Sequence, residues 1–401
     1  MSWESLVGAI VSPVQAMKLA LEEGKRGWGF VAPNPLVGCT IVDRDHRLLS
    51  VGYHAFVGGD HAEISALKKL GDTSKVEGAH VYVTLEPCAH QGRTGSCAKA
   101  LAPLKPASVT YAVEDPNPLV AGKGASLLRE VGVRCDHLRD RSDISTIERA
   151  SLEAAAEELA EVFLHNQRFN EPFIGLKVAM SSDGMIASKT GEPRWLTGEK
   201  SREHVHWLRA GYDAVLVGRG TFETDDPALN IRHPAFPNYE NHAIVVDPSG
   251  RSFSTLLSSN LLQSHEAENI LVVVGDSAEM QSHFAKEAEA IGALDLLGVQ
   301  IIKLPLDSSG EFAMKQMLGA LYKAGIRSIM VEGGARTYGT FVRAGVVHRL
   351  HVYKAPMTIG PDAGLSWSGN FDEADLMKKV DNQTIQRERF SPDEYWTARL
   401  R

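Results

Sequence analysis

Three short stretches in the first quarter of the chain carry residue types that bind zinc. They are His61-Ala62-Glu63, Pro87-Cys88 and Cys97. Zinc prefers imidazole and thiolate ligands in a tetrahedral shell, and a catalytic site keeps the fourth position for water. His61, Cys88 and Cys97 would supply three ligands. Glu63 would then lie beside the metal without binding it, where a carboxylate can take a proton from the water and pass it to a leaving amine.

Local signals predict the elements that would hold these residues. Residues 61–70 are predicted to form a helix with Asp60 as its N-cap, and residues 81–85 form a strand that ends just before Pro87-Cys88. We expect Cys88 to begin the next helix, because a helix N-terminus favours a thiolate. The predicted site therefore lies where helix starts meet the end of a strand.

Each of these signals is weak alone. An isolated His-x-Glu is more often a capped helix start, and two cysteines at this spacing are more often buried thiols than ligands. Their combination favours a catalytic zinc, while a purely structural metal, or no metal, stays open at this point. The other two cysteines, Cys39 and Cys135, lie in strand-like runs and are interpreted as packed thiols.

The second half of the chain has a softer signature. It lacks G-x-G-x-x-G and the P-loop pattern, so neither a Rossmann domain nor a P-loop is supported. Two predicted strands run into glycines, at 217–221 and at 331–335. Such a turn lets the backbone approach a phosphate at a helix N-terminus, and a tight strand-to-helix turn explains it equally well.

The composition is that of an ordinary globular protein. The chain has 401 residues, 23% charged and 43% hydrophobic, which excludes a disordered or collagen-like chain and predicts two or three domains. No run is long and apolar enough for a membrane span, and no basic n-region marks a signal peptide, so we expect a cytoplasmic protein with free cysteines. The net charge of −8 argues against a nucleic-acid partner.

Helix and strand signals alternate through both halves, which predicts an α/β architecture with helices packed over sheets. Between the halves, residues 145–169 are predicted to form one long Ala- and Glu-rich helix, closed by Glu171-Pro172. We therefore expect a first domain at 1–144, a helical linker at 145–171 and a different α/β domain at 172–401.

At these residues the first half closely resembles the deaminase domain of the bifunctional riboflavin-biosynthesis deaminase/reductase family. The wide spacing between Cys88 and Cys97 is typical of that family, whereas common cytidine-type deaminases have P-C-x-x-C. Gly95-Ser96 depart from the pattern, because family members often have two prolines there. The matching stretches, in family order, are PNPLVG (33–38), GYH (52–54), HAE (61–63), TLEPCAHQGRTGSC (84–97) and DPNPLVAGKG (115–124).

The resemblance implies roles for individual residues of the first domain. It implies that Glu63 is the catalytic proton shuttle and that the zinc ligands are His61, Cys88 and Cys97. It also implies that the pyrimidine and the ribose phosphate are held by Asn34, His54, His90 and Arg93. Asp115 and Asn117 either line the pocket or form a D-P-N-P turn, which explains them equally well.

The second half resembles the reductase domain of the same family, which uses NADPH. The matching stretches are LKVAMSSDG (176–184), WLTG (195–198), VGRGT (217–221), TDDPALNIR (224–232) and VEGG (331–334). The resemblance implies that NADPH is bound by Ala179, Trp195, Thr221, Asp225 and Gly334. It implies that the reductase substrate is bound by Lys177, Arg209, Leu229, Arg232 and Glu332. Among these, Arg209 and Arg232 suit the substrate's phosphate, because guanidinium binds phosphate bidentately.

The fold implied by this resemblance is a three-layer cytidine-deaminase-like domain followed by a dihydrofolate-reductase-like α/β domain. The implied activities are hydrolytic deamination of 2,5-diamino-6-(5-phosphoribosylamino)pyrimidin-4-one and NADPH-dependent reduction of the ribosyl side chain, giving 5-amino-6-(5-phosphoribitylamino)uracil. A homo-oligomer is implied by resemblance alone. Two alternatives stay open. One is an active deaminase whose reductase-like module only binds, which is motivated by Pro193 in place of a small polar residue. The other is a zinc deaminase that edits nucleic acid, which the charge balance opposes.

Overall fold

The computed structural model describes residues 3–89, 95–117, 121–189, 196–277 and 283–401, which divide into two compact units. The first unit is Met1–Asn170 and the second is Glu171–Arg401. Among the described residues, no helix is both long and apolar enough to cross a membrane.

The first unit is built on a five-stranded sheet in the order β2-β1-β3-β4-β5. β1 pairs antiparallel with β2 and β3, whereas β3, β4 and β5 are parallel. The strands are β1 (Gly38–Val42), β2 (Leu48–Tyr53), β3 (His80–Leu85), β4 (Ser108–Val113) and β5 (Arg134–His137). The helices are α1 (Pro13–Lys25), α2 (Ala62–Leu70), α3 (Cys97–Leu101), α4 (Lys123–Glu130), α5 (Thr146–Leu159) and α6 (Glu161–Phe169).

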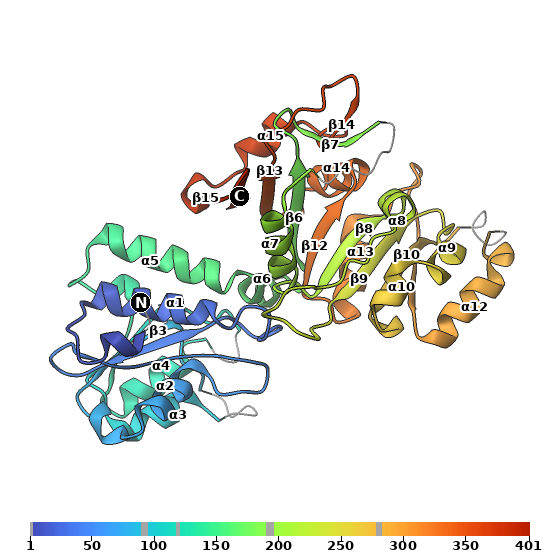
Figure 1. The fold of residues 1–401 in the computed structure, drawn as a ribbon. Helices are drawn as coiled ribbons and strands as arrows, with labels where there is room; N and C mark the ends of the chain where they lie inside the picture. Colours follow the sequence, from blue (N-terminus) through green and yellow to red (C-terminus); the bar gives the residue numbers. More distant parts are fainter. Residues whose placement is uncertain (1–2, 90–94, 118–120, 190–195, 278–282) are drawn as a thin grey trace. The chain divides into compact units, whose positions relative to one another are not determined.

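This unit has three layers, because successive side chains along each strand point to opposite faces of the sheet and helices cover both faces. In β3, Val81 and Val83 pack with α2, α3 and α4, whereas Tyr82 packs on the other face with α1 and α5. Each sheet face therefore has its own apolar cluster and its own set of covering helices (Figure 1). The α/β architecture expected from the alternating signals is confirmed for this unit.

The segment expected to be one connecting helix differs from the prediction. It consists of two helices, α5 and α6, separated at Ala160. Leu152, Ala156, Ala160 and Leu164 follow one another at four-residue spacing and are buried in the cluster that contains α1. The segment is thus part of the first unit's core rather than an isolated connector. The proposed domain bounds stay a prediction.

The second unit is built on a nine-stranded sheet in the order β11-β10-β9-β8-β12-β6-β13-β16-β15. Its neighbours are parallel except for β13 with β16 and β15 with β16. The strands of this sheet are β6 (Phe173–Met180), β8 (Ala214–Gly218), β9 (His242–Asp247), β10 (Ile270–Gly275), β11 (Gln300–Leu304), β12 (Ser328–Gly333), β13 (Arg349–Lys354), β15 (Gln386–Phe390) and β16 (Asp393–Arg399). A separate two-stranded sheet pairs β7 (Met185–Ser188) with β14 (Gly364–Ser366).

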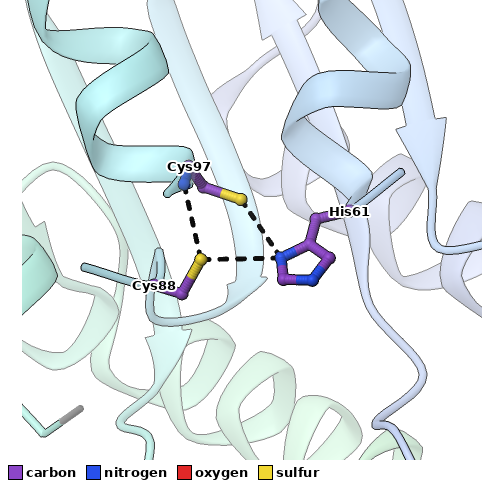
Figure 2. A group of neighbouring side chains, drawn as sticks. All are labelled: His61, Cys88 and Cys97. Atoms are coloured by element: carbon purple, nitrogen blue, oxygen red, sulfur yellow. Dashed lines mark hydrogen bonds between the residues drawn. The ribbon is translucent and has the colours of Figure 1, made fainter. Parts of the chain in front are cut away.

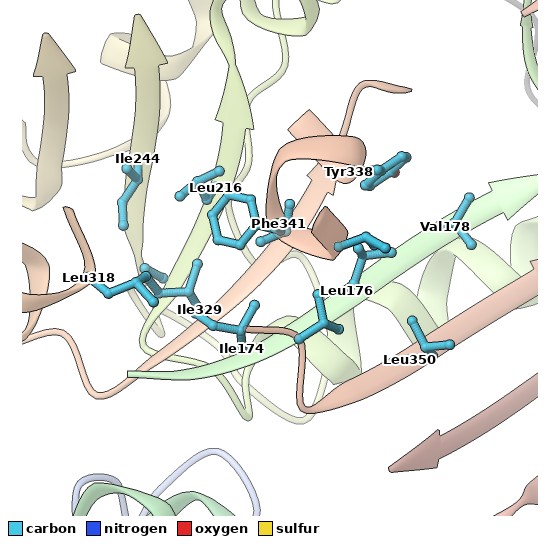
Figure 3. Close-up of a cluster of buried hydrophobic side chains, with 14 of the residues drawn as sticks. Ile174, Leu176, Val178, Leu216, Ile244, Leu318, Ile329, Tyr338, Phe341 and Leu350 are labelled. Atoms are coloured by element: carbon cyan, nitrogen blue, oxygen red, sulfur yellow. The ribbon is translucent and has the colours of Figure 1, made fainter. Parts of the chain in front are cut away.

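Helices cover both faces of the larger sheet. α13 and α14 pack against one face, where Leu318 and Phe341 meet strand residues such as Ile174 and Ile329 (Figure 3). α7 lies against the other face, because its side chains contact Glu332 of β12 and Tyr353 of β13. The helices are α7 (Glu199–Arg209), α8 (Arg219–Asp225), α9 (Phe253–Leu257), α10 (Asn260–Ser264), α12 (Ala288–Leu297), α13 (Met314–Lys323), α14 (Ala335–Arg343) and α15 (Glu373–Lys378).

Candidate functional site

The first unit brings His61, Cys88 and Cys97 together (Figure 2). His61 Nδ1 lies 3.5 Å from Cys88 Sγ and 3.3 Å from Cys97 Sγ. In a tetrahedral zinc site the metal lies about 2.0 Å from nitrogen and about 2.3 Å from sulfur. A nitrogen and a sulfur ligand of the same zinc are then about 3.5 Å apart. The donor set and its spacing therefore fit zinc, with three protein ligands and room for a fourth.

The elements that present these ligands correct two expectations. His61, not Asp60, is the N-cap residue of α2. The Asp60 carboxylate accepts a hydrogen bond from Lys68 Nζ at 2.7 Å instead. Cys88 lies in the segment after β3 and does not begin a helix, whereas Cys97 is the first residue of α3. The backbone N–H of Cys97 nevertheless donates to Cys88 Sγ at 3.4 Å, so a helix start does face the Cys88 sulfur.

A second close contact fixes the segment that carries Cys88. The buried Glu86 carboxylate accepts the N–H of Gly122 at 3.0 Å and that of Ala125 at 3.4 Å, at the start of α4. Gly124 lies so close that a Cβ there would be 1.7 Å from the Pro87 carbonyl oxygen. Glu86 and Gly124 both lie in motifs of the first unit, but no local pattern in the sequence marks the contact that each makes. Their role is to hold α4 against the Cys88 segment.

Glu63 follows His61 on α2 and is only 3% exposed. Burial, reinforced by the charge of Cys88, raises the pKa of Glu63 to about 7. A carboxyl group with such a pKa can both accept and release a proton near neutral pH. A hydrogen bond from Cys97 is the main cause that lowers the pKa of Cys88, to about 4, which favours the thiolate form that binds zinc.

Two expected substrate-binding residues of this unit contact each other near the cluster. His54 is 4% exposed, its ring meets that of His61 edge-on at 5.5 Å, and burial lowers its pKa, so it is neutral. Its Nδ1–H donates to the Asp60 carbonyl oxygen at 2.9 Å, which leaves Nε2 to accept from Asn34 Nδ2 at 3.1 Å. The expected residues His90 and Arg93 lie outside the described residues.

The remaining polar and sulfur candidates of this unit have structural surroundings. Cys39 and Cys135 are buried, and burial raises the pKa of both thiols, to about 12 for Cys135. The Asp115 carboxylate accepts the N–H of Asn117 at 2.9 Å, as in an Asx turn. This burial supports the interpretation of Cys39 and Cys135 as packed thiols, and this hydrogen bond supports the interpretation of Asp115 and Asn117 as parts of a turn.

The second unit contains a cavity of about 1810 Å³ at the carboxyl ends of β6, β8, β9 and β12. Every described residue expected to bind NADPH or the reductase substrate lines it. These residues are Lys177, Ala179, Arg209, Thr221, Asp225, Leu229, Arg232, Glu332 and Gly334. Trp195 and Pro193 lie outside the described residues.

Three charged side chains form a buried cluster at one wall of this cavity. Arg209 donates from Nε to Glu332 Oε1 at 2.7 Å and from Nη2 to Oε2 at 3.1 Å, and Lys177 Nζ lies 3.7 Å from Oε2. Burial alone would raise the pKa of Glu332, but the charges of Arg209 and Lys177 lower it to about 2. Burial also lowers the pKa of the Lys177 ammonium, which favours proton donation.

The two arginines expected to hold a phosphate have different surroundings. Arg209 is committed to Glu332 and also donates from Nη1 to the Asn230 carbonyl oxygen at 2.7 Å. Arg232 is exposed, and its guanidinium donates to the side chain of Asn230. Arg232 therefore keeps donors for an anion, whereas Arg209 mainly fixes Glu332.

The glycine-bearing strand ends shape a further part of the cavity. Gly334 is the N-cap residue of α14, and it has no side chain that could accept the first N–H groups of this helix. A Cβ at Gly334 would lie 2.9 Å from Thr221 Oγ1, and one at Gly218 would lie 2.3 Å from Thr337 Oγ1. The two glycines therefore pack directly against threonine hydroxyls that line the cavity, and the cradle of Gly334 and Thr221 places a helix N-terminus at the cavity wall, an arrangement that suits a phosphate.

The turn after α8 gives two neighbouring aspartates different surroundings. Asp226 lies in the left-handed region at the C-terminal end of α8. Its carboxylate accepts the backbone N–H of Asn260, the first residue of α10, at 2.9 Å. Asp225, its neighbour, lines the cavity, and burial raises the pKa of its carboxyl group.

Comparisons with known proteins agree with both halves of the chain. Residues 12–113 match the family model of the cytidine and deoxycytidylate deaminase zinc-binding region, and residues 172–389 match that of the RibD C-terminal domain. Curated relatives include the riboflavin biosynthesis protein RibD of Bacillus amyloliquefaciens, 35% identical over 86% of this chain and 84% of its own length. RibD of Aquifex aeolicus is 36% identical over 86% of this chain and 87% of its own length.

Solved structures extend the similarity to nearly the whole chain. Form 1 of Acinetobacter baumannii RibD covers 97% of this chain and 98% of its own, with a TM-score of 0.75 and 30% identity. The diaminohydroxyphosphoribosylaminopyrimidine deaminase/5-amino-6-(5-phosphoribosylamino)uracil reductase of Thermotoga maritima covers the same shares, with a TM-score of 0.73 and 27% identity. The expected fold class, a cytidine-deaminase-like domain followed by a dihydrofolate-reductase-like domain, is confirmed. The chain belongs to the RibD family of bifunctional riboflavin biosynthesis proteins, which combine a deaminase with a reductase.

Proposed function

We propose that the first unit is a zinc-dependent deaminase of 2,5-diamino-6-(5-phosphoribosylamino)pyrimidin-4-one. The observation that carries this proposal is the cluster of His61, Cys88 and Cys97, with its ligand spacing, beside the buried Glu63. Zinc at this cluster would supply an activated water to the ring carbon that bears the 2-amino group. Glu63 would hold the proton taken from this water and return it to the leaving ammonia, as its raised pKa allows.

The neighbouring polar residues would orient the pyrimidine ring. The neutral His54 is held through Nδ1 by a backbone carbonyl, and it holds the Asn34 amide through Nε2. Because both side chains are fixed before a ligand arrives, the carbonyl oxygen and the second N–H of the Asn34 amide form a preorganised edge for a heterocycle. His90 and Arg93 belong to the same proposal through the family resemblance, with Arg93 as the phosphate ligand.

We propose that the second unit reduces the deaminated product with NADPH. NADPH would supply a hydride to the ribosyl side chain. The cradle at Gly334 and Thr221 would hold its phosphates, with Ala179, Asp225 and Trp195 as further contacts. Leu229, Arg232 and the Lys177–Glu332 pair would bind the substrate, and the Lys177 ammonium would hold a proton at a polar atom of the substrate while Glu332 keeps it in place.

One experiment tests both proposals. The purified full-length chain is given the diaminopyrimidine phosphate with and without NADPH, while ammonia release, NADPH absorbance and bound zinc are measured. We expect ammonia release without NADPH and oxidation of NADPH only after deamination. Absence of ammonia from zinc-loaded protein refutes the first proposal, and failure to oxidise NADPH with the deaminated product refutes the second.

Glu63→Gln supplies the matched control, because glutamine keeps the size of the side chain and cannot shuttle a proton. We expect this variant to retain zinc and to oxidise NADPH when it is given the deaminated product, while ammonia release falls by about 100-fold or more. Equal ammonia release in the variant would remove Glu63 from the mechanism. The cytoplasmic location, the homo-oligomeric state and the absence of a nucleic-acid partner stay predictions from the sequence.

A further inference from the structure

Asp393, the first residue of β16, binds the start of a helix that lies far away in the sequence. Its Oδ2 accepts the backbone N–H of Gly198 at 2.7 Å and the hydroxyl of Ser201 at 2.6 Å. Asp393 is 1% exposed and Ser201 is fully buried. Gly198 is the N-cap residue of α7 and offers no side-chain cap of its own. Asp393 therefore ties the start of α7 to a different strand, through the backbone of the N-cap residue and the hydroxyl of the third helical residue.

The segment that Asp393 holds forms part of the cavity wall. Leu196 and Thr197, which directly precede Gly198, both line the cavity, and so does Arg202 in the first turn of α7. Arg202 Nη1 donates back to the Thr197 carbonyl oxygen at 2.6 Å. The 196–198 segment is thus fixed to α7, and α7 is fixed at this end to Asp393.

The rest of α7 has other attachments to the sheet. In its middle, His204 Nδ1 lies 2.6 Å from the Tyr353 hydroxyl, and its ring meets the ring of Tyr395 at 4.8 Å. At its end, Arg209 binds Glu332. Loss of the Asp393 carboxylate would therefore release the first turn and the 196–198 segment, while the cluster around Glu332 keeps its own contacts.

We infer that Asp393 is a positioning residue for NADPH binding, acting through Gly198 and Ser201 on the 196–198 segment. This inference rests on the proposed use of NADPH by the second unit. Asp393 lies beyond residues 172–389, the range matched by the RibD C-terminal domain model. The last strand of the chain thus does more than complete the sheet, because it places a wall of the cofactor cavity.

The test uses full-length Asp393→Ala and Ser201→Ala, with Asp372→Ala as the matched control. Asp372 caps α15 by accepting two backbone N–H groups, at 2.8 and 3.2 Å, and does not line the cavity. The KM and kcat for NADPH are measured with the deaminated product, the Kd for NADPH is measured by calorimetry, and ammonia release reports on the first unit. Thermal unfolding gives the folded fraction of each variant.

For Asp393→Ala we expect the KM and Kd for NADPH to rise about tenfold, with kcat and ammonia release within about twofold of the parent chain. Ser201→Ala, which removes only one of the two bonds, shifts both constants in the same direction by less. A merely structural role would lower the amount of active enzyme, and hence kcat, without moving KM. Asp372→Ala leaves all NADPH constants unchanged.

Two results would overturn the inference. One is an unchanged KM and Kd for NADPH in soluble Asp393→Ala. The other, which decides the matter if that variant does not fold, is an unchanged KM and Kd in Ser201→Ala. Failure of the parent chain to bind or oxidise NADPH would instead contradict the proposed reductase function, so the two failures are distinguishable.

Discussion

Replacing Gly124 with alanine tests how α4 supports the candidate metal centre. A Cβ at this position would lie 1.7 Å from the Pro87 carbonyl oxygen. A relaxed carbon–oxygen contact is about 3.3 Å, so the two backbones must separate by about 1.6 Å. Zinc sites tolerate shifts of only about 0.2 Å in ligand distance. Because Cys88 directly follows Pro87, such a movement displaces a proposed ligand well beyond that tolerance.

The expected energetic cost has a distinctive sign. Alanine in an open helix position is more stable than glycine by about 1 kcal/mol. Here overpacking costs about 1–3 kcal/mol and also strains the bonds from Gly122 and Ala125 to Glu86, so we expect a net loss of stability in the first unit. We also expect zinc to be lost to a chelator at least tenfold more readily and ammonia release to fall, while NADPH oxidation with the deaminated product stays unchanged.

Gly319 supplies the control for this experiment. It lies within α13, and a Cβ there would meet nothing within 4 Å. Gly319→Ala should therefore stabilise the chain slightly, while Gly124→Ala destabilises it, although both introduce the same methyl group into a helix. Wild-type stability and wild-type zinc retention in Gly124→Ala would show that the close contact with Pro87 does not hold the metal centre, and our reasoning would fail.

Three further changes have outcomes that follow from the site geometry. Cys88→Ser should abolish zinc retention and ammonia release but spare NADPH oxidation, whereas Cys39→Ser should retain bound zinc, measured by metal analysis. Glu332→Gln should destabilise the second unit by about 3 kcal/mol, because two buried cations lose their partner. Folding lowers the pKa of Glu332 from 4.5 to about 2. The ionised Glu332 carboxylate therefore stabilises the folded state fully above pH 4.5, and this stabilisation is lost as the pH falls towards 2. Acid unfolding of Glu332→Gln should therefore depend less on pH in that range. Arg232→Ala should raise the KM only for the phosphorylated substrate, whereas Arg209→Lys should impair reduction of the phosphorylated and dephosphorylated substrates alike, in steady-state assays.

Local patterns in the sequence predicted most elements of both units. The run of β-branched and aromatic residues V-Y-V-T-L at 81–85 is a property of consecutive residues, and it correctly predicted a strand, which the structure shows to be buried on both faces. The motif His61-Ala62-Glu63 predicted a helix start, which the structure confirms at Ala62. The four-residue spacing from Leu152 to Leu164 was also readable, and it would have indicated a helical stripe packed in the core rather than a free connector.

Contacts between distant residues could not be read from such patterns. The bond from Gly198 to Asp393 joins residues 195 positions apart, and that from Arg209 to Glu332 joins residues 123 positions apart. Neither pair is marked by periodicity or by turn chemistry, because its geometry arises only when the strands are ordered in the sheet. The same limit explains Asp60, whose carboxylate could cap α2 but binds Lys68 instead.

The net charge of −8 required phosphorylated ligands to be held by a few placed cations rather than by a general positive field. The structure narrows that requirement further in the second unit. A guanidinium that makes two bonds to one carboxylate has little left for a substrate, because moving it would leave Glu332 with only the more distant Lys177 ammonium, 3.7 Å away. We therefore propose that Arg209 acts on the charge and orientation of Glu332, and through it on Lys177. In this proposal the exposed Arg232 recognises the substrate's phosphate, because a charged ligand can bind there without first breaking the ion pair of Arg209 and Glu332.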